Sequence, residues 1–207
     1  MTSVIKSTNR RFAKALTSAV CAVGLSAMFL ASPFGTTDAQ ASEGRFIPAV
    51  ASSPPPSGAR NLCSQYRWAC TAKRSAALSS QSEMQIVKQV NRRVNASTRE
   101  VTDQSQYKTR ELWALPTTRG GDCEDFALLK KRDLINAGVD PNKLLIATVL
   151  DTRRTPHAVL IYRSANGDLV LDNLTNRIKP WKATRYLFLR MQDPNQPGRW
   201  VGVYGRS

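Results

Sequence analysis

The hydrophobic pattern of this chain changes its period once, at Gly138, and this change limits the folds that it can adopt. Before Gly138, residues 80–96 and 123–136 repeat apolar side chains at helical spacing. After it, the apolar runs are short, rich in β-branched residues and separated by turn residues, which is typical of strands. Helices followed by neighbouring strands predict an α+β domain with a mostly antiparallel sheet.

The first helix is expected over residues 80–96. The sequence Ser80-Gln81-Ser82-Glu83 matches a capping box, in which a serine and a glutamate satisfy backbone N–H groups at a helix start. The residues that follow place an apolar stripe on one face and basic side chains on the other. This segment is therefore predicted to be an amphipathic helix that covers a core.

The second helix is expected over residues 123–136. Gly120-Gly121 breaks the preceding chain, Asp122 is a suitable N-cap, and Gly138 is placed to act as a C-terminal stop. This reading puts Cys123 in the first turn of the helix.

Five strands are expected after Gly138, with two-residue turns or short polar loops between them. Asn166-Gly167 predicts a tight hairpin between the second and third strands. The sheet is expected to meander through neighbouring hairpins. The predicted strands cover residues 144–150, 157–163, 169–174, 185–191 and 200–204.

Residues 1–41 match a secretory signal peptide, with a basic start, an apolar run over residues 15–30 and small residues at Ala39-Gln40-Ala41. The alternative is a membrane anchor, but the run is shorter than the roughly 20 residues that cross a bilayer. We therefore expect an exported protein that is not an integral membrane protein once the signal is removed. Residues 42–60, rich in Pro, Ser and Ala, predict a linker or loosely held arm, and residues 61–207 the folded domain.

The chain is strongly basic, with 30 Lys and Arg residues against 15 Asp and Glu residues and a formal net charge of +15. Such a charge favours acidic proteins, anionic polysaccharides, nucleic acid or anionic lipid headgroups as neighbours, or serves solubility alone. No run of consecutive basic residues resembles a nucleic-acid-binding arm, and export argues against DNA. We expect no nucleic-acid partner.

The chain without its signal peptide holds three cysteines, Cys63, Cys70 and Cys123. An odd number in an exported protein leaves one thiol over. Cys63 and Cys70 lie close in sequence and can close a small disulfide loop in an oxidising compartment. Cys123 is then the unpaired thiol, and it is either buried and inert or chemically active.

Three residues form a candidate catalytic triad: Cys123, His157 and Asp172. A helix start and a neighbouring imidazolium favour a thiolate, and His157 is the only histidine in the chain. His157 needs a third group to orient its ring, and Asp172 follows on the paired strand, offset diagonally rather than directly opposite. Each residue also has a purely structural interpretation, and the combination of the three favours catalysis.

Three carboxylates flank the thiol, on Asp122, Glu124 and Asp125. Their mutual repulsion needs compensation, and oxygen-rich clusters of this kind suit Ca²⁺. The alternative is that the helix start and solvent compensate these charges.

The same segments resemble one protein family. Trp113-Ala114-Leu115-Pro116 and Gly121-Asp122-Cys123-Glu124-Asp125-Phe126 resemble the nucleophile region of the bacterial transglutaminase-like cysteine peptidases, which include the LapG-type periplasmic proteases. Pro156-His157-Ala158-Val159-Leu160 resembles the histidine strand of that family, and Leu171-Asp172-Asn173-Leu174 its aspartate strand. The order Cys, His, Asp agrees, and Cys63 and Cys70 resemble an early cysteine pair of many members.

The resemblance implies a papain/transglutaminase-like fold, with Cys123 attacking an amide carbonyl, His157 moving the proton and Asp172 orienting His157. It also implies a periplasmic location and calcium held by Asp122 and Glu124, with Asp125 as the third ligand. LapG-type members cut large surface adhesins and are regulated by an inner-membrane c-di-GMP receptor, which connects them to biofilms. The implied partners are therefore a protein substrate, such as an adhesin, and such a receptor.

Three functions stay open at this point. The first is a periplasmic endopeptidase. The second is a transglutaminase- or amidase-type acyl transferase with the same triad, in which the acceptor is not water. The third is a non-catalytic, calcium-dependent binding module, against which the complete triad argues. The backbone N–H of Cys123 is expected to serve the oxyanion hole, and Trp113 either shapes the cleft or belongs to the core.

Overall fold

The computed structural model describes residues 44–72 and 78–206, with side chains up to Val203. The predicted signal peptide lies outside these residues. The helices are α2 (Leu62–Gln65), α3 (Ser80–Ser97), α4 (Asp103–Tyr107) and α5 (Cys123–Asn136). The strands are β1 (Ala51–Ser53), β2 (Leu144–Leu150), β3 (Pro156–Ser164), β4 (Gly167–Leu171), β5 (Lys179–Pro180), β6 (Leu187–Gln192) and β7 (Trp200–Arg206). Short 3₁₀ turns are η1 (Ser57–Ala59), η2 (Arg67–Cys70), η3 (Pro141–Lys143) and η4 (Trp181–Thr184).

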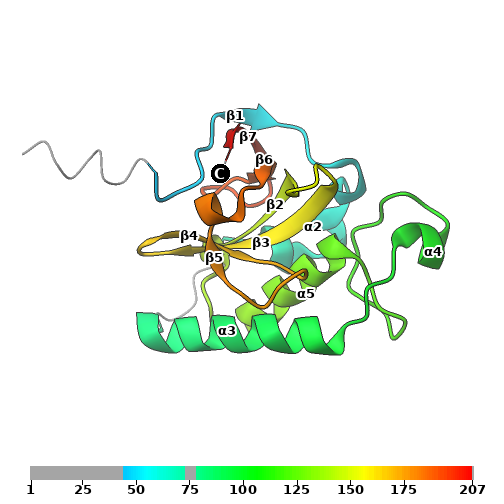
Figure 1. The fold of residues 1–207 in the computed structure, drawn as a ribbon, viewed down its shortest axis with the longest axis horizontal. Coiled ribbons are helices and arrows are strands. Elements are labelled where there is room, and N and C mark those ends of the chain that lie inside the picture. Colours follow the sequence, from blue (N-terminus) through cyan, green and yellow to red (C-terminus); the bar gives the residue numbers. More distant parts are fainter. Residues whose placement is uncertain (1–43, 73–77, 207) are drawn as a thin grey trace, which may run out of the picture. The chain divides into compact units, whose positions relative to one another are not determined.

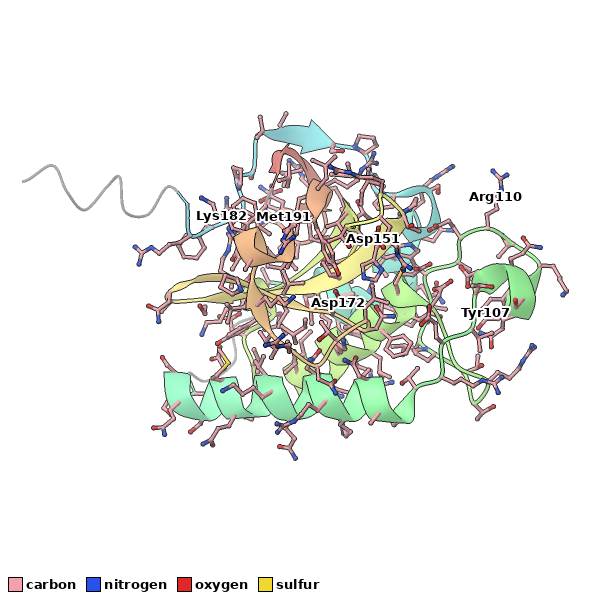
Figure 2. All side chains as sticks on the ribbon, viewed as in Figure 1. Tyr107, Arg110, Asp151, Asp172, Lys182 and Met191 are labelled. Atoms are coloured by element: carbon pink, nitrogen blue, oxygen red, sulfur yellow. A yellow bond between two sulfur atoms is a disulfide. The ribbon has the colours of Figure 1, made fainter. Side chains whose placement is uncertain are left out.

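The strands of the described residues form one seven-stranded antiparallel sheet in the order β1-β7-β6-β2-β3-β4-β5. Helix α5 packs on the sheet, and α3 packs on the outer side of α5 (Figure 1). The segment around α4, which carries Tyr107 and Arg110 in Figure 2, lies at the end of the domain away from the β4–β5 hairpin. This arrangement confirms the predicted α+β class. No helix among the described residues is long and apolar enough to span a bilayer.

The predicted meander is correct from β2 to β5 and for the β6–β7 hairpin, but not for the connection between these two parts. After β5 the chain returns to the opposite side of β2, so that β2 pairs with both β3 and β6. Turn signals predict which strands form hairpins, but they carry no information on a longer connection. Strand β2 is almost fully buried, so the backbone groups along both of its edges need partners, and β6 supplies the second set.

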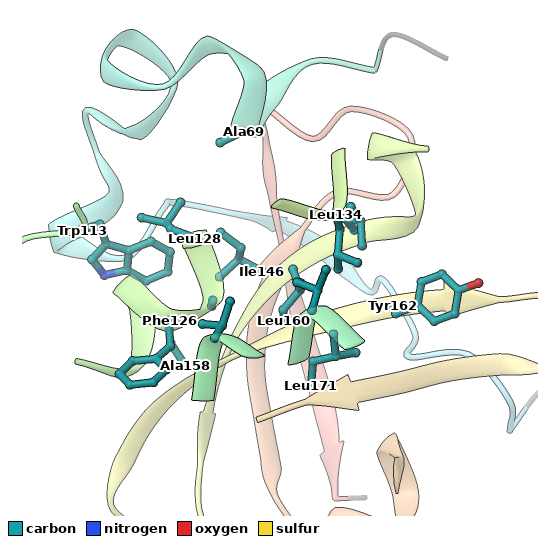
Figure 3. Packing of buried hydrophobic residues seen from close by; sticks show 14 of the residues in the cluster. Ala69, Trp113, Phe126, Leu128, Leu134, Ile146, Ala158, Leu160, Tyr162 and Leu171 are labelled. Carbon is teal, nitrogen blue, oxygen red and sulfur yellow. The ribbon is translucent and has the colours of Figure 1, made fainter. Parts of the chain in front are cut away.

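The sheet is buried on both faces, which explains why β2 and β3 are almost continuously apolar. Along β3, Ala158 and Leu160 face the helices, whereas Val159 and Ile161 face the other side. Figure 3 shows the core between the helices and the sheet, with Ile146, Leu160 and Leu171 beside residues of α5. The core on the other face includes Val149, Val170, Trp181, Phe188, Met191 and Val203.

Helix α3 agrees with the predicted span, but its start differs from the predicted capping box. The N-cap is Ser79, whose side chain accepts a hydrogen bond from the backbone N–H of Ser82. Glu83 does not cap the helix; it is buried and accepts hydrogen bonds from the ammonium of Lys143 and the phenol of Tyr162. A buried carboxylate with two long-range donors holds the helix on the sheet, a role that local sequence does not reveal.

The segment 42–60 differs from the expected loose arm wherever it is described. Strand β1 pairs with β7, and Ile47 is 2% exposed. The backbone N–H of Ile47 donates to Asp168 Oδ2 at 2.8 Å, and the backbone N–H of Asp168 donates to the carbonyl of Arg45 at 2.9 Å. These contacts are made mainly by the backbone, so the polar composition of the segment concealed them. The packed domain therefore begins before the predicted boundary at residue 61.

The β3–β4 hairpin turns one residue earlier than predicted. The pairing of Ser164 with Gly167 makes Ala165 and Asn166 the turn residues. Gly167 instead begins β4 with φ +125°, and an added Cβ would lie 2.6 Å from the carbonyl oxygen of Arg45. The glycine is thus required by the close approach of the N-terminal segment.

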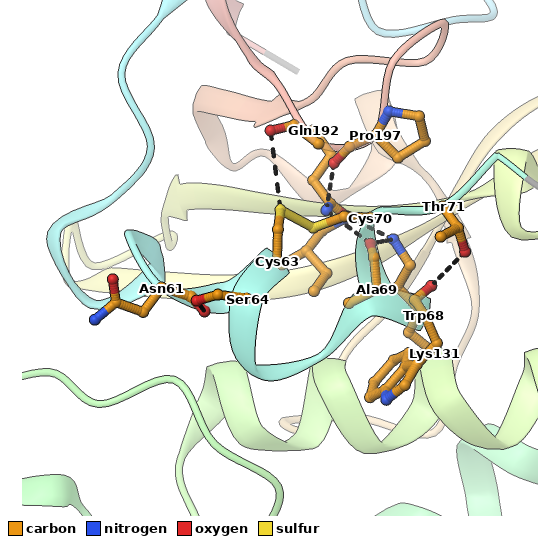
Figure 4. The surroundings of a disulfide bond; sticks show 12 residues. Asn61, Cys63, Ser64, Trp68, Ala69, Cys70, Thr71, Lys131, Gln192 and Pro197 are labelled. Atoms are coloured by element: carbon orange, nitrogen blue, oxygen red, sulfur yellow. Dashed lines mark hydrogen bonds between the residues drawn. A yellow bond between two sulfur atoms is a disulfide. The ribbon is translucent and has the colours of Figure 1, made fainter.

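The predicted disulfide between Cys63 and Cys70 is present, with a Cα–Cα distance of 5.5 Å. Inside its loop, the carbonyl of Ala69 accepts hydrogen bonds from Lys131 Nζ at 2.8 Å and Gln192 Nε2 at 3.0 Å (Figure 4). Lys131 Nζ also donates to Gln192 Oε1 at 2.6 Å. The loop is thereby fastened both to α5 and to β6.

Candidate active site

Cys123 lies at the first position of α5, as predicted, and it is the free cysteine of the described residues. The thiol is half-buried and faces the beginning of β3, where the backbone N–H of Ala158 is a hydrogen-bond donor to it. Two hollows of about 270 and 330 Å³ meet at this point, and both are lined by Cys123 and His157. The thiol and the imidazole therefore share one cleft.

His157 and Asp172 form a close pair. His157 Nε2 lies 2.9 Å from Asp172 Oδ1, so the tautomer with its proton on Nε2 donates to the carboxylate. This leaves Nδ1 as the ring nitrogen that can exchange a proton with a group in the cleft. Tyr186 packs edge-on against the imidazole, with ring centroids 5.9 Å apart.

Asp172 is held by more donors than His157 alone. Tyr186 donates its phenol proton to Oδ2 at 2.6 Å, and the backbone N–H of Leu174 donates to Oδ1 at 3.0 Å. Asn95 of α3 donates to the carbonyl of Asp172 at 2.9 Å. Burial raises the pKa of Asp172, but the hydrogen bond and charge of His157, together with the other donors, outweigh burial and hold it below its usual value. Asp172 is therefore an ionised, buried anchor for the imidazole.

The observed hairpin register also explains how these two residues meet. The ladder between β3 and β4 ends at the pair Leu160 and Leu171. If this register continued, residue 157 would be level with residue 174, two positions from Asp172, instead of four positions away as the predicted turn implied. Asp172 directly follows β4, where the chain bends into the turn closed by its own bond to Leu174. The offset between His157 and Asp172 along the paired strands is thus smaller than predicted. The bend after β4 brings Asp172 the rest of the way to His157.

The surroundings of the thiol oppose the thiolate that a helix start and an imidazolium favour. Cys123 Sγ donates to Glu124 Oε2 at 3.1 Å. Burial first, and then the charge and hydrogen bond of Glu124, raise the pKa of the Cys123 thiol, whereas the Ala158 N–H opposes them. Burial and the neighbouring carboxylate therefore outweigh the backbone donor at this thiol.

The acidic cluster contains a different third member from the one predicted. Asp103, Asp122 and Glu124 each offer an oxygen within 4.8 Å of the others. Asp125 points elsewhere, and its Oδ1 accepts a hydrogen bond from the backbone N–H of Ala114 at 2.9 Å. Successive residues in a helix point about 100° apart, so the side chains of Glu124 and Asp125 leave the helix in different directions. The cluster that the described residues form therefore contains Asp103, and Asp125 lies outside it.

The cluster fits a divalent cation. Asp122 Oδ1 is buried without a hydrogen-bond partner. Burial, followed by the charge of Asp122, raises the pKa of Glu124 to about 9, and burial also raises the pKa of Asp103 to about 6. Buried carboxylates that repel one another, with one oxygen left unpaired, are the donor set of a hard cation such as Ca²⁺.

Sequence reasoning missed Asp103, Tyr186 and Asn95. Asp103 follows the N-cap Thr102 of α4 and resembles any acidic residue in a first helical turn. Tyr186 and Asn95 carry no local signal, because their roles depend on contacts with Asp172 across the fold. Trp113, for which two roles were open, fills both: it is 2% exposed in the core and also lines the smaller hollow.

The chain matches the family model of the bacterial transglutaminase-like cysteine proteinases over residues 49–207. It belongs to this family. As a bacterial transglutaminase-like cysteine proteinase, the protein is a cysteine peptidase, and the matched region includes β1, in agreement with the packed N-terminal segment. No curated protein matches the chain.

Solved structures of LapG from Legionella pneumophila are similar to this proteinase, each with 26% sequence identity and a TM-score of 0.49. The calcium-bound LapG match covers 62% of this chain and 77% of that chain. The match to a second LapG structure covers 59% and 69%, and that to an EGTA-treated form covers 62% and 73%.

Proposed function

We propose that this proteinase is a thiol-dependent endopeptidase in which Cys123, His157 and Asp172 form the catalytic triad. The observation that carries this proposal is the close His157–Asp172 pair, with Nε2 and Oδ1 2.9 Å apart, in the cleft that holds the free thiol. The arrangement has the three roles of such a triad: a nucleophile at a helix start, an imidazole beside it and a buried carboxylate behind the imidazole.

The reaction begins when the thiol transfers its proton to His157 Nδ1 and Sγ attacks the carbonyl carbon of the scissile amide. The carbonyl oxygen becomes a negatively charged oxyanion, and the backbone N–H of Cys123 at the helix start stabilises this charge. The imidazolium then protonates the amine as the C–N bond breaks and leaves a thioester. His157 next takes a proton from water, whose oxygen attacks the thioester and releases the acid and the thiol. Asp172 stays ionised and stabilises the imidazolium.

Calcium is the cation proposed for the acidic cluster, held by Asp103, Asp122 and Glu124. When bound, it supplies positive charge that offsets the carboxylates beside the thiol. Glu124 contributes to both functions, because one of its oxygens lies 3.1 Å from Sγ.

The location and the partners are proposed from the sequence together with the site. Residues 1–41 direct export to the periplasm, where the disulfide between Cys63 and Cys70 is stable. The substrate is a protein, of which a large surface adhesin is the example implied by the resemblance, and an inner-membrane c-di-GMP receptor is the proposed regulator. The strongly basic chain favours an acidic substrate surface.

The test compares the mature protein with its Cys123→Ala variant on a periplasmic extract from a strain that lacks the gene. New protein N-termini, identified by terminal labelling and mass spectrometry, are expected with the wild type and calcium but not with the variant. A labelled primary amine is included as a competing acceptor. Incorporation of the amine without new N-termini would replace the peptidase by an acyl transferase, and no covalent change at all would overturn both.

A further inference from the structure

We propose that Pro56 of the N-terminal segment and Leu189 of β6 form the walls of a substrate subsite beside the thiol, and that this subsite takes an uncharged, apolar side chain. The inference rests on the proposed peptidase function, because it treats the cleft at Cys123 as the place where a polypeptide binds. It assigns a specificity role to a segment that the composition predicted to be a linker.

The first step is the course of the N-terminal segment. After pairing with β7, the chain leaves β1 and is held at Pro54, whose carbonyl accepts a hydrogen bond from Arg190 Nη1 at 3.1 Å. Pro56 and Ser57 then line the smaller hollow together with Cys123 and His157. The segment therefore reaches the cleft through contacts with β6 and β7.

The segment packs against the indole of Trp113 at Gly58. An added Cβ on Gly58 would lie 2.6 Å from Cδ1 of Trp113 and 3.1 Å from its Nε1. The backbone of the segment thus touches the indole, and only a glycine fits at this position. The next residue, Ala59, is 3% exposed in the core. This wall is a fixed part of the cleft.

The second wall is formed at an irregularity in β6. Val149 pairs with Phe188 and Thr148 pairs with Arg190, so Leu189 is the extra residue of a β-bulge. Bulges redirect side chains and are frequent beside active sites. Leu189 lines the hollow and is 37% exposed, an apolar side chain displayed at a cleft instead of in the core.

The side chains that line the smaller hollow indicate which kind of substrate residue it binds. Pro56 and Leu189 provide accessible apolar surface, and the buried Trp113 and Ala158 also line the hollow. Its two remaining charged neighbours besides Glu124 already have partners: Glu111 Oε2 accepts from Trp113 Nε1 at 3.2 Å, and Arg190 donates to Pro54. The volume of about 270 Å³ suits one or two residues of a peptide.

The second hollow contrasts with the first. It is lined mainly by charged and polar side chains, which include the acidic cluster and two arginines. The two sides of the thiol therefore differ in the number of charged side chains that line them, and an uncharged substrate residue is favoured on the side of Pro56 and Leu189. These charged lining residues of the second hollow are Glu100, Asp103, Arg110, Glu111, Asp122, Glu124, Asp151 and Arg153.

The test uses two alkylating reagents that differ only in an apolar group, iodoacetamide and N-benzyl iodoacetamide, on the full mature protein with calcium. The rate of Cys123 labelling is measured by mass spectrometry, and the ratio of the two rates is divided by the same ratio for glutathione. We expect the wild type to favour the benzyl reagent about tenfold, as burial of part of one aromatic ring predicts. Leu189→Lys, at a half-exposed position, is expected to reduce the normalised ratio to about one.

Gly58→Val displaces the other wall and is expected to lower the ratio as well, whereas Val50→Ala, in the same segment but 58% exposed, leaves it unchanged. Melting temperatures check that each variant is folded. A labelled thiol whose ratio is the same in the wild type and Leu189→Lys would overturn the subsite alone. Failure of both reagents to label Cys123 in the wild type would overturn the proposed nucleophile and the subsite with it.

Discussion

Cys123 Sγ and Glu124 Oε2 lie 3.1 Å apart at the first turn of α5. The same carboxylate that faces the thiol also belongs to the acidic cluster with Asp103 and Asp122. The ionised form of this carboxyl group opposes formation of the thiolate, and it becomes populated as pH rises toward the raised pKa of Glu124, about 9. Whatever neutralises Glu124 therefore controls the reactivity of the nucleophile.

The first prediction follows from that relationship. In the wild type, calcium is expected to increase the rate of Cys123 alkylation by iodoacetamide, and EGTA to reverse the increase. Glu124→Gln cannot ionise, so at pH 9, near the raised pKa of Glu124, its thiol should react at least as fast in EGTA as the wild type does with calcium. Alkylation is followed by mass spectrometry. A Glu124→Gln thiol that stays slow in EGTA would show that the carboxylate does not restrain the nucleophile.

The second prediction separates Asp103 from Asp125 as a calcium ligand. Calcium is expected to raise the melting temperature of the wild type and of Asp125→Asn, but not that of Asp103→Asn, because only Asp103 faces the other two acids. Asp103 accepts a hydrogen bond from the backbone N–H of Leu112, and Asp125 accepts one from the backbone N–H of Ala114. The amide oxygen of asparagine can still accept this bond in each variant. The reverse pattern, a calcium shift lost only in Asp125→Asn, would restore the sequence-based assignment.

The third prediction concerns the phenol of Tyr186. Tyr186→Phe keeps the ring against His157 but removes a hydrogen bond to the Asp172 carboxylate, and bonds to charged groups contribute about 1.5–3 kcal/mol. The pKa of Asp172 is held low in the folded protein, so its contribution to stability is present above its unfolded pKa and is lost as pH falls through the folded value. Losing a donor raises the folded pKa, and both acid unfolding and the acidic limb of the pH–rate profile should move to higher pH.

The control for this prediction is Tyr162→Phe. Tyr162 also donates to a buried carboxylate, that of Glu83, but lies away from the cleft. We expect it to lower stability without moving the pH–rate profile, and turnover to fall about tenfold or more only in Tyr186→Phe. Equal effects of the two changes on the pH–rate profile would mean that Tyr186 is merely structural.

The fourth prediction concerns pH and the buried Lys131. Burial lowers its pKa to about 7, so between pH 7 and 10 the unfolded chain binds more protons at this lysine than the folded protein does. Stability should therefore rise with pH in this window, by about 1 kcal/mol per pH unit for one lysine. Lys131→Met should flatten the slope, while Ala69 and Gln192 keep their other hydrogen-bond partners. Urea unfolding at several pH values measures how the free energy of unfolding changes with pH.

The matched control for the lysine prediction is Lys88→Met, which removes an exposed lysine of α3 and should leave the slope unchanged. Lys130 of α5 is also buried, and burial lowers its pKa to about 7, so part of the slope is expected to remain in Lys131→Met. Identical slopes for the wild type and Lys131→Met would contradict the prediction.

The fold could be predicted from the sequence where the signals are local. The helix over 123–136 and its stop at Gly138 are confirmed, because period and breaker residues act within a few residues. The strand over 144–150 is confirmed for the same reason. The return of β6 beside β2 and the packing of residues 45–59 could not be predicted, because they depend on backbone partners far along the chain.

In the candidate site, too, the local features could be predicted and the long-range contacts could not. The sequence by itself determined the residue types available for chemistry: one thiol at a helix start, one imidazole and an acidic block beside the thiol. Only the tertiary structure decided which groups meet, bringing Asp103 in place of Asp125 to the acidic cluster and Tyr186 to Asp172. The physical reason is range, since helical period, turns and charge order act over a few residues. A side chain's partners across the domain depend on how all the elements pack together.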